Sequence, residues 1–417
     1  MNVYSPVTTD GIPNLHAIRR KRNEILAISI VVFLFILTFS ALAWYFYANP
    51  RIDPSHCGER LAGYYRGWGG RKVSDSQLEK LTHVIYSSAV MDTNGNVTFG
   101  NKEELFMELQ NKSRSVNPDL KVLVAIGSGS YKSVDFMVET EKNETFIHSI
   151  TSFISKYDID GVELQWKHYP GSVASKQLQL IRNLRAALIN LADSQNRTSP
   201  YVLAVSLPST EWPSNNGVSL DHLLEHVDFV NVASFDYSIS PGPFAPLYST
   251  NHTKDKHFSK DTKNVDYTLK SQACQTKQWS KINMGVGFYG RSWKNVLEPD
   301  QVRNELAWTS GSMDIKGDTV QWRNLKNQQK EDSESVNPHI WDSENKEYIS
   351  FENERSLAEK AKYAVEKNLG GITISMLDFD DDNDTLLNAV ASVDLCKGYV
   401  ERKNRMEYRC EDIFVDI

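Results

Sequence analysis

Polar and apolar residues alternate between Asp160 and Pro170, and this run holds the side chains best placed to do chemistry. Successive side chains of a β-strand point to opposite faces, so Glu163, Gln165 and Lys167 share one face. Polar groups on an inward face are costly to bury without partners, and such a run therefore indicates a site rather than a core. Of these three residues only Glu163 has a carboxyl group for acid–base chemistry. Lys167 is a poor acid, because the ordinary pKa of a lysine side chain is about 10.4.

The elements that must position this run are eight apolar, β-rich segments that alternate with helix-length stretches. Such alternation predicts a parallel sheet, and eight units close a (β/α)8 TIM barrel, an α/β fold. The predicted strands are Leu61–Tyr65, His83–Ser87, Lys121–Ile126, Gly161–Trp166, Tyr201–Leu207, Phe229–Ser234, Ile282–Gly287 and Gly371–Met376. The predicted helices include Asp75–Leu81, Glu103–Asn111, Phe146–Lys156, Lys176–Ala192 and Ser356–Lys367.

About 80 residues separate the last two predicted strands, far more than one crossover helix needs. Residues 295–353 in this gap contain short β-like pieces, so we expect a small α+β insertion. The acidic run Asp378–Asp384 is typical of a solvated loop at the barrel rim, which we favour over a metal site. Residues 57–396 then form the folded domain, and 397–417 form a C-terminal extension.

Several further motifs lie in the order found in one enzyme family. Asp160–Pro170 closely resembles the family 18 glycoside hydrolase signature Asp-Gly-x-Asp-x-Asp-Trp-Glu-Tyr-Pro, and the resemblance extends over about residues 58–395. This family comprises the chitinases and their relatives, and the resemblance implies the same barrel, with the insertion before the eighth strand. The other matching motifs are Gly63–Trp68, Thr82–Tyr86, Lys121–Gly127, Val227–Asn231, Ala245–Tyr248, Tyr289–Ser292 and Leu369–Asp378.

The resemblance also implies a mechanism that this chain lacks the groups to perform. Family 18 hydrolases use the substrate's acetamido oxygen as nucleophile, the final Glu of the signature as acid, and the preceding Asp as its partner. Lys167 stands at the Glu position and Gln165 at the Asp position. One extra residue before Tyr169 puts His168 in the acid position in an alternative register, but Gln165 still lacks the carboxylate. Glu163 cannot replace the acid, because it lies about 13 Å along the strand from residue 167.

Other positions that bind the sugar in the family differ as well. Ser88, Gly129, Phe235 and Ser375 stand where the family has a Phe, part of a Gly-Gly-Trp loop, a Tyr and a Trp. Sugars stack on aromatic rings, so these differences remove affinity and positioning. We therefore predict a catalytically inactive member of the family, a pseudoenzyme.

Six residues still match the family. Asp160 and the ligand-binding candidates Tyr64, Trp68, Asp236, Tyr289 and Arg291 are retained, either for a ligand or for packing. The expected function is binding of chitin or another N-acetylglucosamine-containing glycan without hydrolysis. A barrel scaffold for a protein partner is the alternative, and an active hydrolase that uses His168 is a third.

Composition excludes other classes of function. A net charge of −7 gives no reason to expect a nucleic-acid partner, and no spacing suggests a metal or cofactor site. Cys57, Cys274, Cys396 and Cys410 permit three disulfide pairings, which the sequence leaves open. Because Cys57 opens the folded domain, a bond from it to a C-terminal cysteine is plausible.

The N-terminal region predicts a membrane anchor. Ile25–Ala48 is uncharged, strongly apolar and roughly 36 Å long as a helix, enough to cross a bilayer. The basic cluster Arg19–Arg22 precedes it, so residues 1–24 are expected in the cytoplasm, with a stalk at 49–56 and a type II topology. A cleaved signal peptide ending near Ala43 is the alternative, against which the length of the apolar run argues.

Glycosylation sequons support this topology. All of them lie beyond the apolar segment, which places the barrel in an extracellular or luminal compartment where cysteines can pair. The candidates are Asn96, Asn111, Asn143, Asn196, Asn251 and Asn383.

Overall fold

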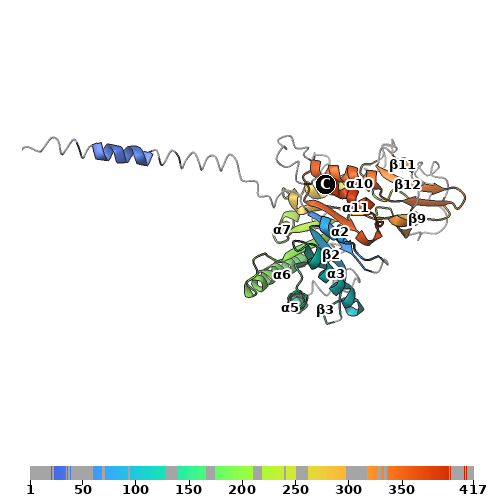
Figure 1. Cartoon of the computed structure of the whole chain (residues 1–417), viewed down its shortest axis with the longest axis horizontal. Coiled ribbons are helices and arrows are strands. Elements are labelled where there is room, and N and C mark those ends of the chain that lie inside the picture. Colours follow the sequence, from blue (N-terminus) through green and yellow to red (C-terminus); the bar gives the residue numbers. More distant parts are fainter. Residues whose placement is uncertain are drawn as a thin grey trace, which may run out of the picture. The chain divides into compact units, whose positions relative to one another are not determined.

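The structure is a computed structural model. It describes residues 20, 23–33, 35, 38, 60–67, 71–92, 94–127, 140–165, 174–209, 218–238, 241–249, 262–296, 317–325, 330–332, 336–393, 395, 408 and 410. The chain divides into two compact units, Met1–Pro54 and Ser55–Ile417. In the first unit residues 23–33 are helical (Figure 1). Much of the predicted span Ile25–Ala48 lies outside the described residues, and within the described part no helix is both long and apolar enough to cross a membrane.

The second unit contains a closed barrel of parallel strands. β1 pairs with both β14 and β2, which closes the order β1, β2, β4, β5, β6, β7, β8, β14 into a ring. All eight predicted strands are confirmed, and each begins within one residue of its predicted start. Their bounds are β1 Arg60–Tyr65, β2 His83–Met91, β4 Lys121–Ile126, β5 Gly161–Gln165, β6 Val202–Leu207, β7 Phe229–Val232, β8 Ile282–Gly287 and β14 Gly371–Ser375. The short β3, Val97–Thr98, extends β2 by an antiparallel pairing.

Helices surround these strands (Figure 1). The five predicted helices are confirmed as α2 Asp75–Lys80, α3 Glu103–Val116, α5 Thr140–Tyr157, α6 Ala174–Ser194 and α10 Glu354–Glu366. The shorter helices α7 Leu220–Leu224, α8 Val265–Ala273 and α11 Thr385–Ala391 follow later strands. Local sequence sets the start of α2, where Ser74 and Gln77 form a reciprocal capping box.

A second, antiparallel sheet lies between β8 and β14 in the chain and extends to one side in Figure 1. Its order is β10-β9-β13-β12-β11, with β9 Tyr289–Trp293, β10 Asp318–Gln321, β11 Lys330–Asp332, β12 Asn337–Asp342 and β13 Glu347–Ser350. The predicted boundary at residue 295 is therefore wrong, because Tyr289 already pairs in this sheet. The described part of the insertion contains strands and the 3-10 helix Trp322–Asn324, without an α-helix.

The acidic run Asp378–Asp384 is not the solvated loop that its composition predicts, because three of its carboxylates are buried. Asp378, Asp380 and Asp384 are each at most 2% exposed. The Asp380 carboxylate accepts hydrogen bonds from Leu386 N and Leu387 N at the start of α11. Burial raises the pKa of Asp380 to about 6, although these hydrogen bonds oppose the rise. The first turn of α11 requires acceptors for its free N–H groups, and this requirement draws the acid inside.

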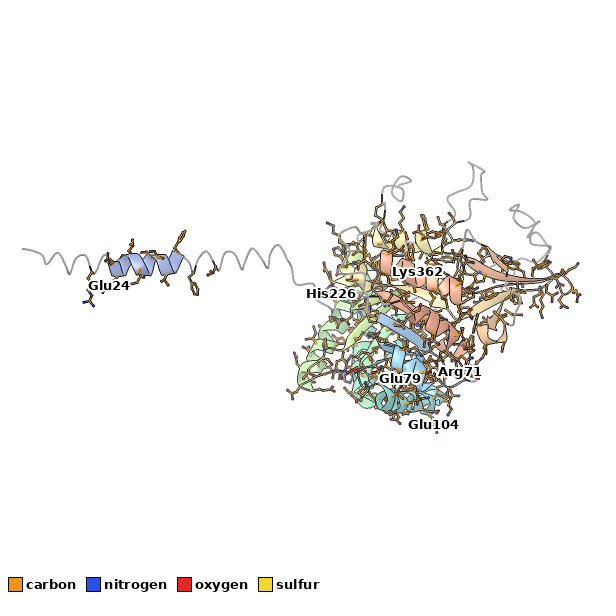
Figure 2. All side chains as sticks on the ribbon, turned by 45° about the horizontal axis from the view of Figure 1, so that its top comes forward. Glu24, Arg71, Glu79, Glu104, His226 and Lys362 are labelled. Atoms are coloured by element: carbon orange, nitrogen blue, oxygen red, sulfur yellow. A yellow bond between two sulfur atoms is a disulfide. The ribbon has the colours of Figure 1, made fainter. Side chains whose placement is uncertain are left out.

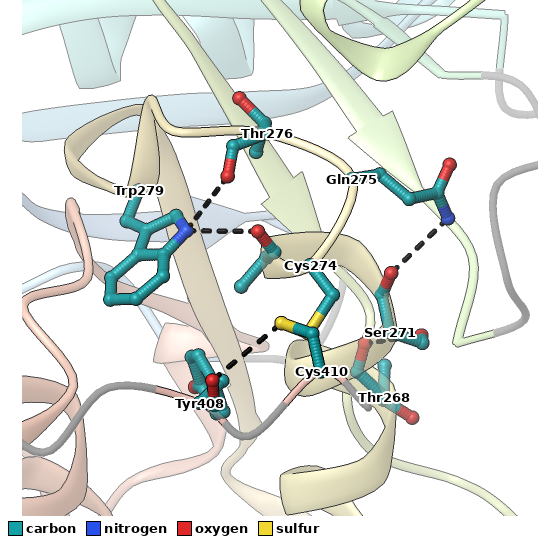
Figure 3. The surroundings of a disulfide bond; sticks show 9 residues. Thr268, Ser271, Cys274, Gln275, Thr276, Trp279, Tyr408 and Cys410 are labelled. Atoms are coloured by element: carbon teal, nitrogen blue, oxygen red, sulfur yellow. Dashed lines mark hydrogen bonds between the residues drawn. A yellow bond between two sulfur atoms is a disulfide. The ribbon is translucent and has the colours of Figure 1, made fainter. Parts of the chain in front are cut away.

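The C-terminal extension is in part a component of the folded domain (Figure 3). Cys410 forms a disulfide bond with Cys274, which follows α8. Tyr408 is buried, its hydroxyl lies 2.9 Å from that of Tyr363 on α10, and its ring packs edge-on against Trp279. The bond Cys274–Cys410 selects one of the three pairings. It leaves Cys396 as the only C-terminal cysteine for the bond expected of Cys57, and both lie outside the described residues.

Loss of this disulfide should destabilise the domain. We expect Cys274→Ser and Cys410→Ser each to lower the free energy of unfolding by about 2–5 kcal/mol, because the bond closes a long loop of the unfolded chain. The double variant should match either single variant, since the bond is already lost. Chemical denaturation measures the effect, with the exposed Lys362→Ala as control. Equal unfolding midpoints for wild type and Cys410→Ser would contradict the structural role.

Candidate functional site

A cavity of about 650 Å³ opens at the carboxyl ends of the barrel strands. Nearly every barrel strand supplies part of its wall, and active sites of such barrels lie at this face. The lining includes Tyr64, Ser87, Ser88, Gln165, Ser206, Asn231, Gly285, Thr373 and Ser375. The hydroxyl and amide groups among them can donate and accept hydrogen bonds, as a polar ligand requires.

Beneath the cavity lies the buried carboxylate of Glu163 on β5. The Tyr64 hydroxyl lies 2.6 Å from Oε2 and 2.8 Å from Oε1 of Glu163. Gln165 Nε2 donates to Oε1 at 2.9 Å, and Asn231 Nδ2 donates to Oε2. Both oxygens are therefore hydrogen-bonded, by donors on three different strands.

The polar network continues across the barrel from Asn231. Its amide oxygen accepts hydrogen bonds from Asn283 Nδ2 at 2.8 Å and from Thr373 Oγ1 at 2.6 Å. Asn283 in turn accepts a hydrogen bond from Arg60 Nε at 3.1 Å. The interior is thus a connected chain of polar groups between β5 and β1, in which each member has a partner.

Burial changes the ionisation of this network. It raises the pKa of Glu163 above its ordinary value, although the hydrogen bonds from Tyr64, Gln165 and Asn231 act in the opposite direction. Burial also raises the pKa of Tyr64 well above its ordinary value, and the neighbouring Glu163 charge adds to the rise. The Tyr64 hydroxyl therefore stays protonated and acts as a donor.

One wall of the cavity is aromatic. Phe235 and Tyr289 both line it, with ring centroids 6.1 Å apart in an edge-on arrangement. Phe244 packs behind Tyr289 at 4.9 Å. On β14 the lining residues are Thr373 and Ser375, which offer hydroxyls instead of a ring. Aromatic contact is thus available from the side of the cavity formed by residues 235 and 289.

Comparison with known proteins assigns the family. The model of glycosyl hydrolases family 18 matches residues 60–380. The chain belongs to this family. It is 26% identical over 355 residues to chitotriosidase-1 of Mus musculus, an alignment covering 79% of this chain and 75% of that protein.

Solved structures share the fold. A class V chitinase mutant of Cycas revoluta in complex with (GlcNAc)3 has a TM-score of 0.66 and 19% identity, covering 79% of this chain and 98% of that one. YKL-39, solved in the presence of chitooligosaccharides, has a TM-score of 0.67 and 20% identity, covering 80% of this chain and 97% of that one.

The structure separates the residues that match family 18 positions into two groups. Tyr64 and Tyr289 line the cavity. Asp236 and Arg291 instead form an ion pair, with Arg291 Nε 2.7 Å from Asp236 Oδ1, and neither is among the described lining residues. Asp160 accepts a hydrogen bond from Val122 N at 2.8 Å at the opposite end of the sheet, which is a structural role.

Three further predicted positions, Trp68, Lys167 and His168, lie outside the described residues. Sequence reasoning also missed parts of the site. Asn231, Arg66 and Lys102 were not proposed as site residues, yet all three line the cavity. Asn231 carried a usable signal, because an amide between two valines on a strand points to the polar inner face. Among the described residues no group of three His, Cys, Asp or Glu side chains could hold a metal ion.

The sequons also differ in their accessibility. Asn96, Asn111, Asn196 and Asn383 are exposed, whereas Asn143 on α5 is 4% exposed. A glycan on Asn143 is incompatible with this packing, so that candidate is disfavoured. Asn251 lies outside the described residues.

The buried Glu163 should make stability depend on pH. When the pKa of a carboxyl group is higher in the folded state than in the unfolded state, its contribution to stability is fully present at a pH below the unfolded-state pKa. This contribution is lost as the pH rises through the folded-state pKa. We therefore expect the wild type to lose stability relative to Glu163→Gln as pH rises from about 4 to 7. Thermal unfolding measured across this pH range tests the prediction, since each kcal/mol of stability shifts the Tm by about 2–4 °C.

The matched control for this series is Glu104→Gln, an exposed carboxylate on α3 (Figure 2). Its Tm should run parallel to that of the wild type at every pH. A Glu163→Gln curve that also runs parallel to the wild type would show that Glu163 titrates as an ordinary exposed carboxylate.

Proposed function

We propose that the barrel binds an N-acetylglucosamine-containing glycan and does not hydrolyse it. Membership of family 18 supports the ligand class, as do relatives solved with chitooligosaccharides. The cavity supports it too, because hydroxyl and amide groups on its floor suit sugar hydroxyls. The Phe235 and Tyr289 wall suits the apolar face of a sugar ring.

The observation that carries the absence of hydrolysis is the hydrogen bond from Gln165 to Glu163. Hydrolysis by the substrate's acetamido group develops positive charge, which the family balances with a carboxylate at the position of Gln165. An amide that donates its N–H group to Glu163 supplies no negative charge there. In the sequence Lys167 stands where the acid is needed, and its positive charge opposes the transition state further.

A protein-binding scaffold is the second candidate, and Ser375 is the observation that favours it. A hydroxyl on β14 gives a sugar ring no surface for stacking. If calorimetric titration detects no binding of N-acetylglucosamine-containing ligands, the scaffold function is favoured.

We also propose that the barrel is displayed by a type II membrane anchor. The uncharged run Ile25–Ala48 and the basic residues before it support an uncleaved anchor with a cytoplasmic tail at 1–24. The disulfide bond Cys274–Cys410 is consistent with an oxidising compartment on the far side.

Hydrolysis should be absent in a direct assay. We expect the purified full chain to release no product from chitotetraose above the buffer rate, because the acid and its partner carboxylate are both missing. Chromatography of the reaction products measures this. Turnover that disappears in Lys167→Ala or His168→Ala would overturn the proposal.

A back-substituted variant extends this assay. The double substitution Gln165→Asp with Lys167→Glu should restore little or no activity, because Phe235 and Ser375 still replace the family's tyrosine and tryptophan. Recovery of robust turnover would mean that the rest of the groove is intact.

Membrane topology can be tested with the sequons. In eukaryotic cells the full chain should stay in the membrane fraction after alkaline carbonate extraction and lose mass on deglycosylation. Asn196→Gln should remove one glycan, whereas Asn143→Gln should leave the mass unchanged because Asn143 is buried. A chain without residues 1–54 should be soluble and unglycosylated. Release of the full chain by carbonate would contradict the anchor.

A further inference from the structure

The charged groups that line the cavity have one sign. Among the described lining residues, Arg66 and Lys102 carry charge, and both are cations. They come from different elements: Arg66 directly follows β1, and Lys102 ends the 3-10 helix Gly100–Lys102 that follows β3. A neutral oligosaccharide can only accept hydrogen bonds from two cations, whereas an anionic ligand is also attracted by their charge.

Arg66 is half-buried, and this position favours an anion. Removing a guanidinium from water costs free energy, and burial accordingly lowers the pKa of Arg66. The buried Asp378 is close enough to oppose this effect and balance part of the charge. A ligand oxygen at the cavity surface would add charge-assisted hydrogen bonds, which a planar guanidinium can donate in pairs.

Lys102 is also half-buried, in the wall formed after β2 and β3. The adjacent Glu103 is exposed and lies 3.4 Å from Lys156 on α5, away from the lining residues. Lys102 thus lines the cavity, while the carboxylate next to it in sequence lies beside Lys156. Val90, Phe99 and Gly100 line the same wall, so the β2–β3 extension shapes this part of the cavity.

Asp378 balances part of the Arg66 charge, whereas the other two carboxylates near the cavity have partners of their own. Glu163 lies beneath the lining, where its oxygens are hydrogen-bonded to Tyr64, Gln165 and Asn231. Asp236 is paired with Arg291.

We propose that the cavity prefers an acidic glycan. In such a glycan N-acetylglucosamine either alternates with a sugar that bears a carboxylate or itself bears a sulfate group, and Arg66 and Lys102 bind this anionic group. This inference rests on the proposed glycan-binding function and narrows its ligand class. The aromatic wall contacts the sugar ring, and the two cations contact the anionic group. Lys102 and Arg66 are thus the residues that determine specificity.

Calorimetric titration of the full chain in detergent tests the proposal with three tetrasaccharides. These are neutral chitotetraose, a hyaluronan tetrasaccharide that carries carboxylates, and chitotetraose sulfated at the 6-hydroxyls. At least one acidic ligand should bind about tenfold more tightly than chitotetraose, and the two acidic ligands distinguish carboxylate from sulfate. Only the acidic ligand's affinity should fall as NaCl rises from about 50 to 300 mM.

Matched variants assign the effect to these residues. Lys102→Gln should weaken the acidic ligand about threefold and Arg66→Gln about tenfold, and each should weaken chitotetraose by a smaller factor. The control Lys362→Gln removes an exposed ammonium on α10 and should change neither ligand (Figure 2). Because Lys102 lies at the cavity surface, its variant keeps the test valid if Arg66→Gln fails to fold.

The outcomes separate the two proposals. Chitotetraose binding as tight as that of both acidic ligands, or acidic binding unchanged in Lys102→Gln, would overturn the preference and leave glycan binding intact. Absence of binding to all three tetrasaccharides would overturn both.

Discussion

A buried carboxylate that requires several donors organises the interior of this barrel. An unpaired Glu163 would cost several kcal/mol, and its oxygens are instead hydrogen-bonded to side chains on β1, β5 and β7. None of these three strands pairs with another of the three, so the hydrogen bonds from Tyr64 and Asn231 cross the barrel and complement those between neighbouring strands. The polar floor of the cavity lies directly above this network, and its position depends on it.

The same network bears on the chemistry of the cavity. Both oxygens of Glu163 accept hydrogen bonds from protein donors, so the one carboxylate of the inner β5 face is tied into the fold. The Gln165 amide completes this arrangement, because its N–H group donates to Glu163 while the residue also lines the cavity. The proposed change from cleavage to binding is consistent with a polar floor whose members stabilise one another.

Much of the fold could be predicted, because strands that are buried on both faces appear in sequence as apolar runs. The period of two placed Glu163 and Gln165 on one face, as the structure shows. That period could not identify Asn231 as a partner, since which strands face each other depends on how the ring closes. Composition also failed to predict the burial of Asp380. Its carboxylate accepts hydrogen bonds from the first N–H groups of α11, and composition does not reveal where that helix starts. Pairing of Cys274 with Cys410 depended likewise on tertiary packing.

The junction between β8 and β9 has a mechanical consequence. A single residue, the buried Phe288, separates the last barrel position Gly287 from Tyr289, the first position of the second sheet. Tyr289 also lines the cavity and pairs with Gln321 on β10. The cavity wall and the second sheet therefore share one continuous stretch of backbone. A displacement of that sheet, for example by a bound partner, would therefore move the Tyr289 side of the cavity wall.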